Sequence, residues 1–199
     1  GMLGVHCENG DLVDELIQSY VSQGKLTPHY HPLSRPAAVE AEAVARYLMI
    51  AEMADLPVNI VHLSTKRSLE AVERARQRGQ SVYVETCPQY LLLDDHLYDA
   101  PNFEAAKYVC SPPLRKREDQ QALWQGIKEG AINTISTDHC SFNFHGQKTV
   151  GKDDFSKIPN GMPGVETRPE LIYTEGVAKG RITLEKMVAL LSENIAKQF

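Results

Sequence analysis

Several features that define large classes of proteins are missing from this sequence. No stretch reaches the roughly 18 to 20 apolar residues that a membrane-spanning helix needs, and no charged-then-apolar signal segment opens the chain. Basic residues are not in excess, because 21 Lys and Arg stand against 26 Asp and Glu and give a formal net charge of −5. A nucleic-acid-binding domain normally shows a basic stripe or patch. We therefore expect neither a membrane nor a nucleic acid among the partners.

Cysteine is also scarce, with 4 residues in a chain of 199. The cysteines form no CxxC pair and lack the dense spacing of a disulfide framework: Cys7, Cys87, Cys110 and Cys140. This usage predicts reduced thiols in a cytoplasmic protein.

The composition is that of an ordinary soluble domain, with 42% hydrophobic and 24% charged residues. A chain of 199 residues is long enough for one domain with a substantial core. Its start is unusual, because residues 2–6 already have the pattern of a strand and a natural domain seldom begins inside a core strand. We expect residues 1–199 to form a single, incomplete domain that is a piece of a longer protein.

Strand-like and helix-like segments alternate along the chain. Short apolar or β-branched runs predict four strands, at residues 3–7, 57–63, 81–86 and 131–137. Helical spacing of apolar residues predicts helices at residues 11–23, 36–55, 64–79, 117–129, 166–179 and 184–193. The alternation indicates an α/β fold with a parallel sheet. Four strands are half of a (β/α)8 barrel, which has eight and typically ~250 residues, so the pattern fits either an open doubly wound sheet or about half a barrel.

A polar loop is expected at residues 25–35. At its end, Ser34 is expected to cap the following helix, with Pro36 in the first turn. The loop also contains His29 and His31, the H-x-H spacing by which one strand can offer two metal ligands. Because prolines flank the pair and no apolar strand precedes it, we expect no metal pair there.

Polar side chains stand where three of the predicted strands end. His6 belongs to the end of the first strand, His62 to the second and Asp138 to the last. In parallel α/β folds the active site forms outside the carboxyl ends of the strands. Neutral imidazoles and a carboxylate suit a zinc-like ion, and a carboxylate can also move the proton of an activated water. A single histidine at a strand end is more often a hydrogen-bonded core residue, but the three together predict a metallohydrolase site. His139, next to Asp138, would point the other way on a strand and is expected to be structural.

Two rigid loops are candidates for substrate contacts. Residues 110–115 contain two prolines, which fix the backbone and allow Ser111 to present a main-chain group to a ligand. Residues 158–164, in the long loop after the last strand, hold two glycines and two prolines and form a shaped turn. From the residues alone, simple tight turns explain both segments equally well.

Six segments resemble, in order, the dihydropyrimidinase/D-hydantoinase family of cyclic amidohydrolases: VHCENG at 5–10, VHLS at 61–64, ETCPQYL at 85–91, CSPPLR at 110–115, STDHC at 136–140 and PNGMPG at 159–164. Residues 191–199 look like a helix near the end of that family's barrel. The resemblance covers essentially the whole chain. It implies a partial (β/α)8 TIM barrel made of about the last four βα units, with parallel strands and outer helices.

The resemblance also implies roles for individual residues. His6 and His62 would be ligands of one zinc ion, and Asp138 would bind a second zinc ion and act as the catalytic proton shuttle. Ser111 and Asn160 would bind the cyclic imide through main-chain groups. The TCPQYL segment is more similar to hydantoinases and dihydropyrimidinases than to dihydroorotases. It therefore favours a dihydropyrimidine or a 5-substituted hydantoin as substrate.

Part of the family's site has no counterpart in this chain. Missing are the H-x-H pair of the first barrel strand, the carbamylated lysine that bridges the two metals, the tyrosine that supports the substrate oxyanion, and the flanking β-sandwich domain. Half of the metal-binding side chains remain, so we expect weak metal binding and little or no hydrolysis by the chain alone. A half barrel also leaves sheet edges and an apolar face open, and we expect homo-oligomers that cover them.

Two alternative functions remain open. The collapsin response mediator proteins resemble this family in fold and act as binding or scaffold proteins without metals. Such relatives lose the metal ligands, whereas His6, His62 and Asp138 are all present here. An allantoinase or a dihydroorotase would differ only in which cyclic amide ring it recognises.

Overall fold

Four short strands lie side by side in one parallel sheet in the computed structural model, which describes residues 2–199. The strands are β1 (Leu3–Val5), β2 (Val58–Ile60), β3 (Val82–Thr86) and β4 (Thr134–Ile135), and their order in space is their order in the chain. A doubly wound sheet reverses its direction of growth at a switch point, whereas a barrel adds each strand beside the last. The sheet is therefore one arc of a barrel, which decides between the two predicted architectures.

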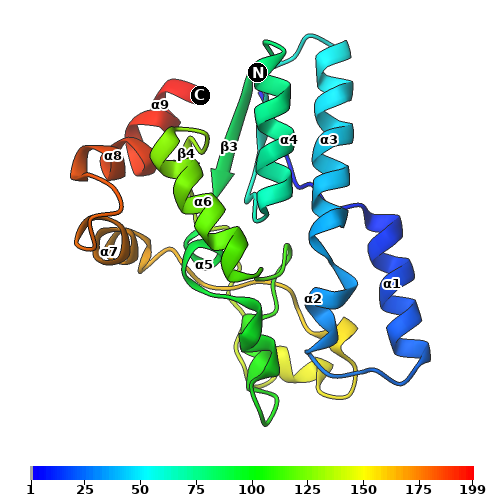
Figure 1. The fold of residues 1–199 in the computed structure, drawn as a ribbon. Helices are drawn as coiled ribbons and strands as arrows, with labels where there is room; N and C mark the ends of the chain where they lie inside the picture. The colour runs from blue at the N-terminus through cyan, green and yellow to red at the C-terminus, as the bar shows by residue number, and fades with distance from the viewer. Residues whose placement is uncertain (1) are drawn as a thin grey trace.

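Three long helices cover one face of the sheet. They are α3 (Ala37–Met53), α4 (Lys66–Gln77) and α6 (Arg117–Glu129), which connect successive strands and pack side by side like the outer helices of a barrel (Figure 1). Two further helices, α1 (Gly10–Ser22) and α2 (Tyr30–Ser34), lie beyond the N-terminal end of α3 (Figure 1). Among the described residues, none of the helices combines the length and the apolar character needed to cross a membrane.

Shorter elements follow β3 and β4. They are α5 (Pro88–Leu92), η1 (Asp95–Asp99), η2 (Glu104–Tyr108), η3 (Lys148–Gly151), η4 (Phe155–Lys157), α7 (Arg168–Ile172), η5 (Tyr173–Val177), α8 (Leu184–Val188), η6 (Ala189–Glu193) and α9 (Asn194–Gln198). The last two predicted helices are both present, but each passes into a wider, π-helical segment, η5 or η6. The final helical region continues past residue 193, the end given by apolar spacing, to Gln198, as the resemblance at residues 191–199 implies.

Side-chain caps set the helix starts next to the strand ends. The Asn9 side chain accepts a hydrogen bond from the Leu12 amide at 3.2 Å and begins α1. The Thr65 hydroxyl accepts one from the Ser68 amide at 3.1 Å and begins α4. Each cap lies a few residues after a strand, β1 or β2. The segments that carry His6 and His62 are therefore held between a strand and a capped helix.

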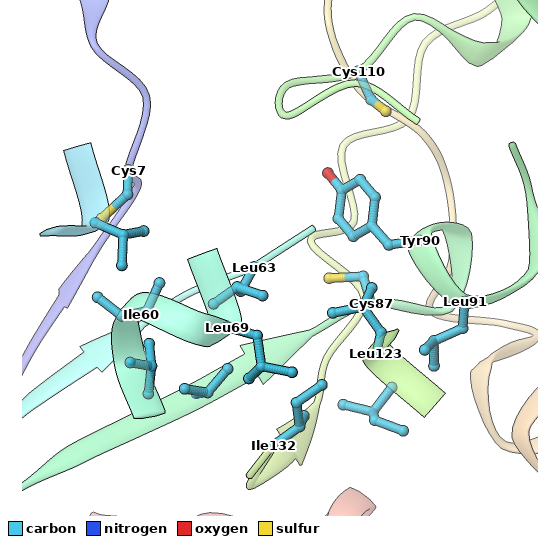
Figure 2. Close-up of a cluster of buried hydrophobic side chains, with 14 of the residues drawn as sticks. Cys7, Ile60, Leu63, Leu69, Cys87, Tyr90, Leu91, Cys110, Leu123 and Ile132 are labelled. Carbon is cyan, nitrogen blue, oxygen red and sulfur yellow. The ribbon is translucent and has the colours of Figure 1, made fainter. Parts of the chain in front are cut away.

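The core lies between the sheet and its outer helices. Along β3, Val82 and Val84 face the helices and are buried, while the alternate residues Tyr83 and Glu85 face the other way and stay partly exposed. Figure 2 shows part of the buried cluster, to which strands, helices and loops all contribute: Cys7, Ile60, Leu63, Leu69, Cys87, Tyr90, Leu91, Cys110, Leu123 and Ile132. The partly exposed face of β3 is therefore the face turned away from the helices.

The expected loop at residues 25–35 is wrong in part, because α2 forms within it. Pro32 lies in the first turn of α2, where a residue needs no intrahelical amide bond and proline is tolerated. Ser34 does not cap α3, since its hydroxyl donates instead to the His31 carbonyl at 2.8 Å. The N-cap of α3 is Pro36, which makes no side-chain cap.

Candidate metal and substrate site

His6 and His62 meet at the carboxyl ends of two adjacent strands. His6 follows β1 directly, and His62 lies just beyond β2. The Nδ1 atom of His6 is 2.9 Å from the Nε2 atom of His62, and the two rings stand edge to face at an interplanar angle of 70°. The two ring nitrogens are therefore within hydrogen-bond distance of each other at one edge of the sheet.

His62 is held in a restricted environment. It is a non-glycine residue with a left-handed backbone, φ +39°, and is 6% exposed. Burial lowers the pKa of its imidazole, and the neighbouring His6 lowers it further, against the opposing charges of Asp138 and Glu40. His62 is thereby kept neutral, which is the form that binds a metal.

The histidine pair fits a zinc-like ion. Two nitrogens on one tetrahedral zinc lie about 3.3 Å apart, because each Zn–N bond is about 2.0–2.1 Å long. At 2.9 Å, His6 Nδ1 and His62 Nε2 form a hydrogen bond, and a separation only about 0.4 Å larger would place both nitrogens on one zinc ion. The second nitrogen of His62, Nδ1, is buried without a hydrogen-bond partner, whereas Nε2 is the nitrogen that faces His6.

Glu8 completes the histidine pair, and the sequence reasoning did not identify it. Its Oε2 atom lies 3.2 Å from His6 Nε2 and 2.7 Å from a guanidinium nitrogen of Arg35, and its side chain is 2% exposed. Burial alone would raise the pKa of Glu8, but the hydrogen bond to His6 and the charges of Arg35 and Arg115 bring it below its usual value. Glu8 is therefore an ionised partner for the far nitrogen of His6, leaving Nδ1 to face His62. A carboxylate two residues after a candidate ligand was the available signal.

Asp138 lies on the same side of the sheet, three residues beyond β4. It is exposed and has a left-handed backbone, φ +47°. Its charge acts on Glu85 as well as on His62: burial raises the pKa of Glu85 and Asp138 raises it further, while a hydrogen bond from Ser136 opposes the rise. The structure thus brings Asp138 within electrostatic range of the histidine pair.

The loops that carry Ser111 and Asn160 are joined through their backbones. The Gly161 amide, next to Asn160, donates to the Val109 carbonyl at 3.0 Å. Asn160 is exposed, and the Ser111 hydroxyl oxygen is buried with no hydrogen-bond partner. The two predicted substrate-contact residues therefore sit on neighbouring segments.

Two of the other histidines are occupied by structural contacts. His31 Nε2 lies 2.8 Å from the Cys110 carbonyl, and burial lowers the pKa of His31 to about 4. His139 Nδ1 accepts hydrogen bonds from the amides of Gly164 and Val165, at 3.2 and 3.3 Å. The sequence predicts a structural role for His139, whereas for His31 it predicts only that no metal pair forms with His29.

A compact cluster of potential metal ligands occurs elsewhere, at Asp94, Asp95 and His96. Across residues 2–199 no other group of three such side chains is as tight. Its residues begin η1, where the Asp94 side chain accepts a hydrogen bond from the His96 amide at 3.2 Å. This cluster is accounted for as a helix cap with exposed charges.

Comparison with known proteins matches this arrangement of residues to one group of enzymes. No family model matches the chain. It is 47% identical to the D-hydantoinase of Geobacillus stearothermophilus over 195 residues, which are 98% of this chain and 41% of that protein. It is 45% identical to a D-phenylhydantoinase of Escherichia coli (O1:K1 / APEC) over 196 residues, 98% of this chain and 42% of that protein.

Solved structures agree with the sequence comparison. The crystal structure of dihydropyrimidinase from Brevibacillus agri NCHU1002 matches with a TM-score of 0.98 and 44% identity, over 99% of this chain and 43% of that one. The chain spans about two fifths of the length of these relatives. Over that part, the sequence identity and the structural match agree, and the chain belongs to the dihydropyrimidinase/D-hydantoinase family.

Proposed function

We propose that this chain supplies part of the active site of a zinc-dependent hydrolase that opens a cyclic amide, either a dihydropyrimidine or a 5-substituted hydantoin. The observation that carries the proposal is the convergence of His6 Nδ1 and His62 Nε2 at the carboxyl ends of β1 and β2. Asp138, at the end of β4, supports it through its charge. Family membership supports the reaction class, because the relatives are hydantoinases and a dihydropyrimidinase.

Each side chain has a separate part in this reaction. His6 and His62 would hold one metal ion, with Glu8 fixing the ring of His6, and Asp138 would contribute to a second ion. When bound, the metals would supply Lewis-acid chemistry to the ring carbonyl and the attacking water. Asp138 takes the proton of the attacking water, whose oxygen bonds to the carbonyl carbon. The ring C–N bond then breaks, and the leaving nitrogen receives the proton from Asp138.

Substrate orientation falls to the loops beside the metal pair. Main-chain groups at Ser111 and Asn160 hold the imide edge of the ring. The hydrogen bond from the Gly161 amide to the Val109 carbonyl holds the two segments at a fixed position relative to each other. Fixed main-chain groups bind a planar imide without loss of side-chain freedom.

The chain alone has too few ligands for efficient catalysis. With His6 and His62 as the protein ligands of one ion, binding is weak and hydrolysis is negligible. We also propose that copies of the chain associate through the open edges of the sheet, and that the protein works in the cytoplasm. All four cysteines are free, three of them buried, which supports the last point.

A segment exchange tests the function. This chain replaces the matching segment of the Geobacillus stearothermophilus D-hydantoinase, which then supplies the remaining part of the site. The exchanged protein is expected to hydrolyse hydantoin or dihydrouracil, with kcat lower by about 100-fold or more in D138N. The control H96A changes an exposed histidine outside the site and should keep full activity. A folded, zinc-loaded exchange protein without turnover would refute the proposal and favour a binding or scaffold role.

A further inference from the structure

Lys148 is a buried lysine at the start of η3, in the long loop after β4. It is 3% exposed, although lysine is among the residues least often buried. Its ammonium nitrogen donates to three main-chain carbonyls, those of Val109 at 2.7 Å, Pro159 at 2.7 Å and Gly161 at 3.0 Å. An ammonium group has three donors, so every one of them is used.

Two of the three carbonyls belong to the candidate segment 158–164, and the third, that of Val109, directly precedes the segment 110–115. Val109 lies two residues before Ser111, while Pro159 and Gly161 stand on either side of Asn160. Lys148 therefore sits between the segments and holds both. The direct bond from the Gly161 amide to the Val109 carbonyl reinforces the same connection.

The second segment is also tied to the strand end that carries Asp138. His139 pairs with Met162 in an isolated parallel bridge, and the Cys140 amide donates to the Met162 carbonyl at 3.1 Å. The turn around Asn160 is thus fixed at two places: to Asp138's neighbours by this bridge, and to the Ser111 segment by Lys148.

Burial of the charged Lys148 ammonium at this position costs free energy. Desolvation lowers the pKa of Lys148 to about 8, which records the cost of keeping its charge away from water. The ring of Phe142, 5.5 Å from the ammonium, adds a cation–π contact. An apolar side chain here would leave three carbonyls without this donor. The two segments would then lose the ammonium group that fixes the distance between them.

We propose that Lys148 is a positioning residue that sets the distance between the main-chain groups of Ser111 and Asn160 and so determines the affinity for the cyclic imide. The proposal rests on the function proposed above. Lys148 touches neither the substrate nor the metal, and its effect reaches the ring only through the two segments. Substrate and transition state use the same main-chain contacts, so loss of Lys148 weakens both equally.

The first test uses the segment-exchange protein. K148M removes the charge and all three donors at similar length, and K148R keeps a charged donor group. K152M, four residues on and exposed, is the matched control. K148M is expected to raise KM by about tenfold or more with kcat within about threefold, K148R to raise it less, and K152M to leave both unchanged. An unchanged KM in a folded K148M protein, or a loss confined to kcat, would overturn the proposal.

A second measurement separates this inference from the proposed function and does not need activity. In the ¹⁵N-labelled chain, K148M and K148R should shift the backbone amide resonances of Ser111 and Asn160, and K152M should leave them in place. Should K148M not fold, K148R and K148Q are compared in the same way. If these amides do not move, Lys148 has no positioning role even where the exchange protein is active. If they move while the unmutated exchange protein is inactive, the proposed function fails and the structural role of Lys148 stands.

Discussion

Arg115 and Glu40 form a buried ion pair, with a guanidinium nitrogen of Arg115 3.3 Å from Glu40 Oε2. Both side chains are at most 5% exposed. Glu40 also accepts hydrogen bonds from the amides of Ser64 and Thr65, each at 3.1 Å. Arg115 ends the candidate substrate segment 110–115, and Ser64 lies two residues after His62. The pair therefore connects the candidate substrate segment 110–115 with the residues that follow His62.

Replacement of Glu40 by alanine should destabilise the chain strongly. It removes the nearest carboxylate from the buried Arg115 and leaves two buried backbone amides without their acceptor, and breaking a buried pair in this way costs about 3–5 kcal/mol. Urea denaturation followed by circular dichroism measures the change. The control is E42A, on the same helix, whose exposed pair with Arg46 should be worth only about 0–1 kcal/mol. Equal effects of the two variants would contradict this prediction.

His31 should make the free energy of unfolding decrease as the pH is lowered. Burial holds its folded pKa at about 4, below the usual 6.5, so the unfolded chain takes up this proton first as the pH falls. The unfolded state binds more protons between these values, and stability present above pH 6.5 is lost as the pH falls to about 4. The shift corresponds to about 3 kcal/mol.

The comparison of two histidine variants isolates this effect. H31Q keeps a donor for the Cys110 carbonyl but does not titrate, so its advantage over the unmutated chain should grow on acidification from pH 6.5 to 4. H29Q, at an exposed neighbour that pairs with Asp99, should not show this growth. Free energies of unfolding at several pH values provide the measurement. Parallel curves for H31Q and the unmutated chain would exclude His31 as the cause.

Gly161 should tolerate no side chain. A Cβ atom at this position would lie 2.4 Å from the Cys140 carbonyl oxygen and 2.8 Å from the Cys140 Cβ. G161A must therefore displace the turn that carries Asn160, and such overpacking typically costs about 1–3 kcal/mol. In the exchange protein it should also raise KM. G10A, where no atom lies within 4 Å of the new Cβ, is the control and should leave both stability and KM near their original values.

Glu8 should govern metal affinity through His6. The variant E8Q keeps the shape of the side chain but removes the ionised partner of His6 Nε2. Loss of such a partner typically lowers metal affinity by about 10–100-fold. Competition with a chromophoric chelator measures the zinc affinity of the exchange protein, with D11N on the nearby α1 as control. An E8Q protein that retains full zinc affinity would remove Glu8 from the site.

The order of the four strands and of the long helices is predictable from the sequence, since each of these elements shows the expected apolar pattern. The helix expected at 117–129 has those bounds in the structure. The last strand is much shorter than its predicted 131–137, because regular pairing is limited to Thr134 and Ile135. Before it, the Asn133 side chain accepts a hydrogen bond from the Val84 amide at 2.8 Å and takes up a donor of the neighbouring strand. The pattern of apolar residues cannot predict that a side-chain oxygen will accept a hydrogen bond from the neighbouring strand.

Part of the site is also predictable from the sequence. His6 and His62 stand out because strand ends of a parallel sheet meet at one edge. Lys148 does not stand out, since its partners Val109, Pro159 and Gly161 come from two other segments and only the folded loop brings them together. In the sequence, Lys148 stands in a polar loop, where a lysine side chain is normally expected to be exposed to solvent.

The central claim is that His6 and His62 bind one metal ion through two particular nitrogens. Zinc titration of the chain with ¹⁵N-labelled histidine, followed by two-dimensional NMR of the imidazole nitrogens, tests it most directly. The account predicts that excess zinc shifts Nδ1 of His6 and Nε2 of His62 together. Zinc-induced shifts confined to His96, beside Asp94 and Asp95, or the absence of any shift at His6 and His62, would contradict it.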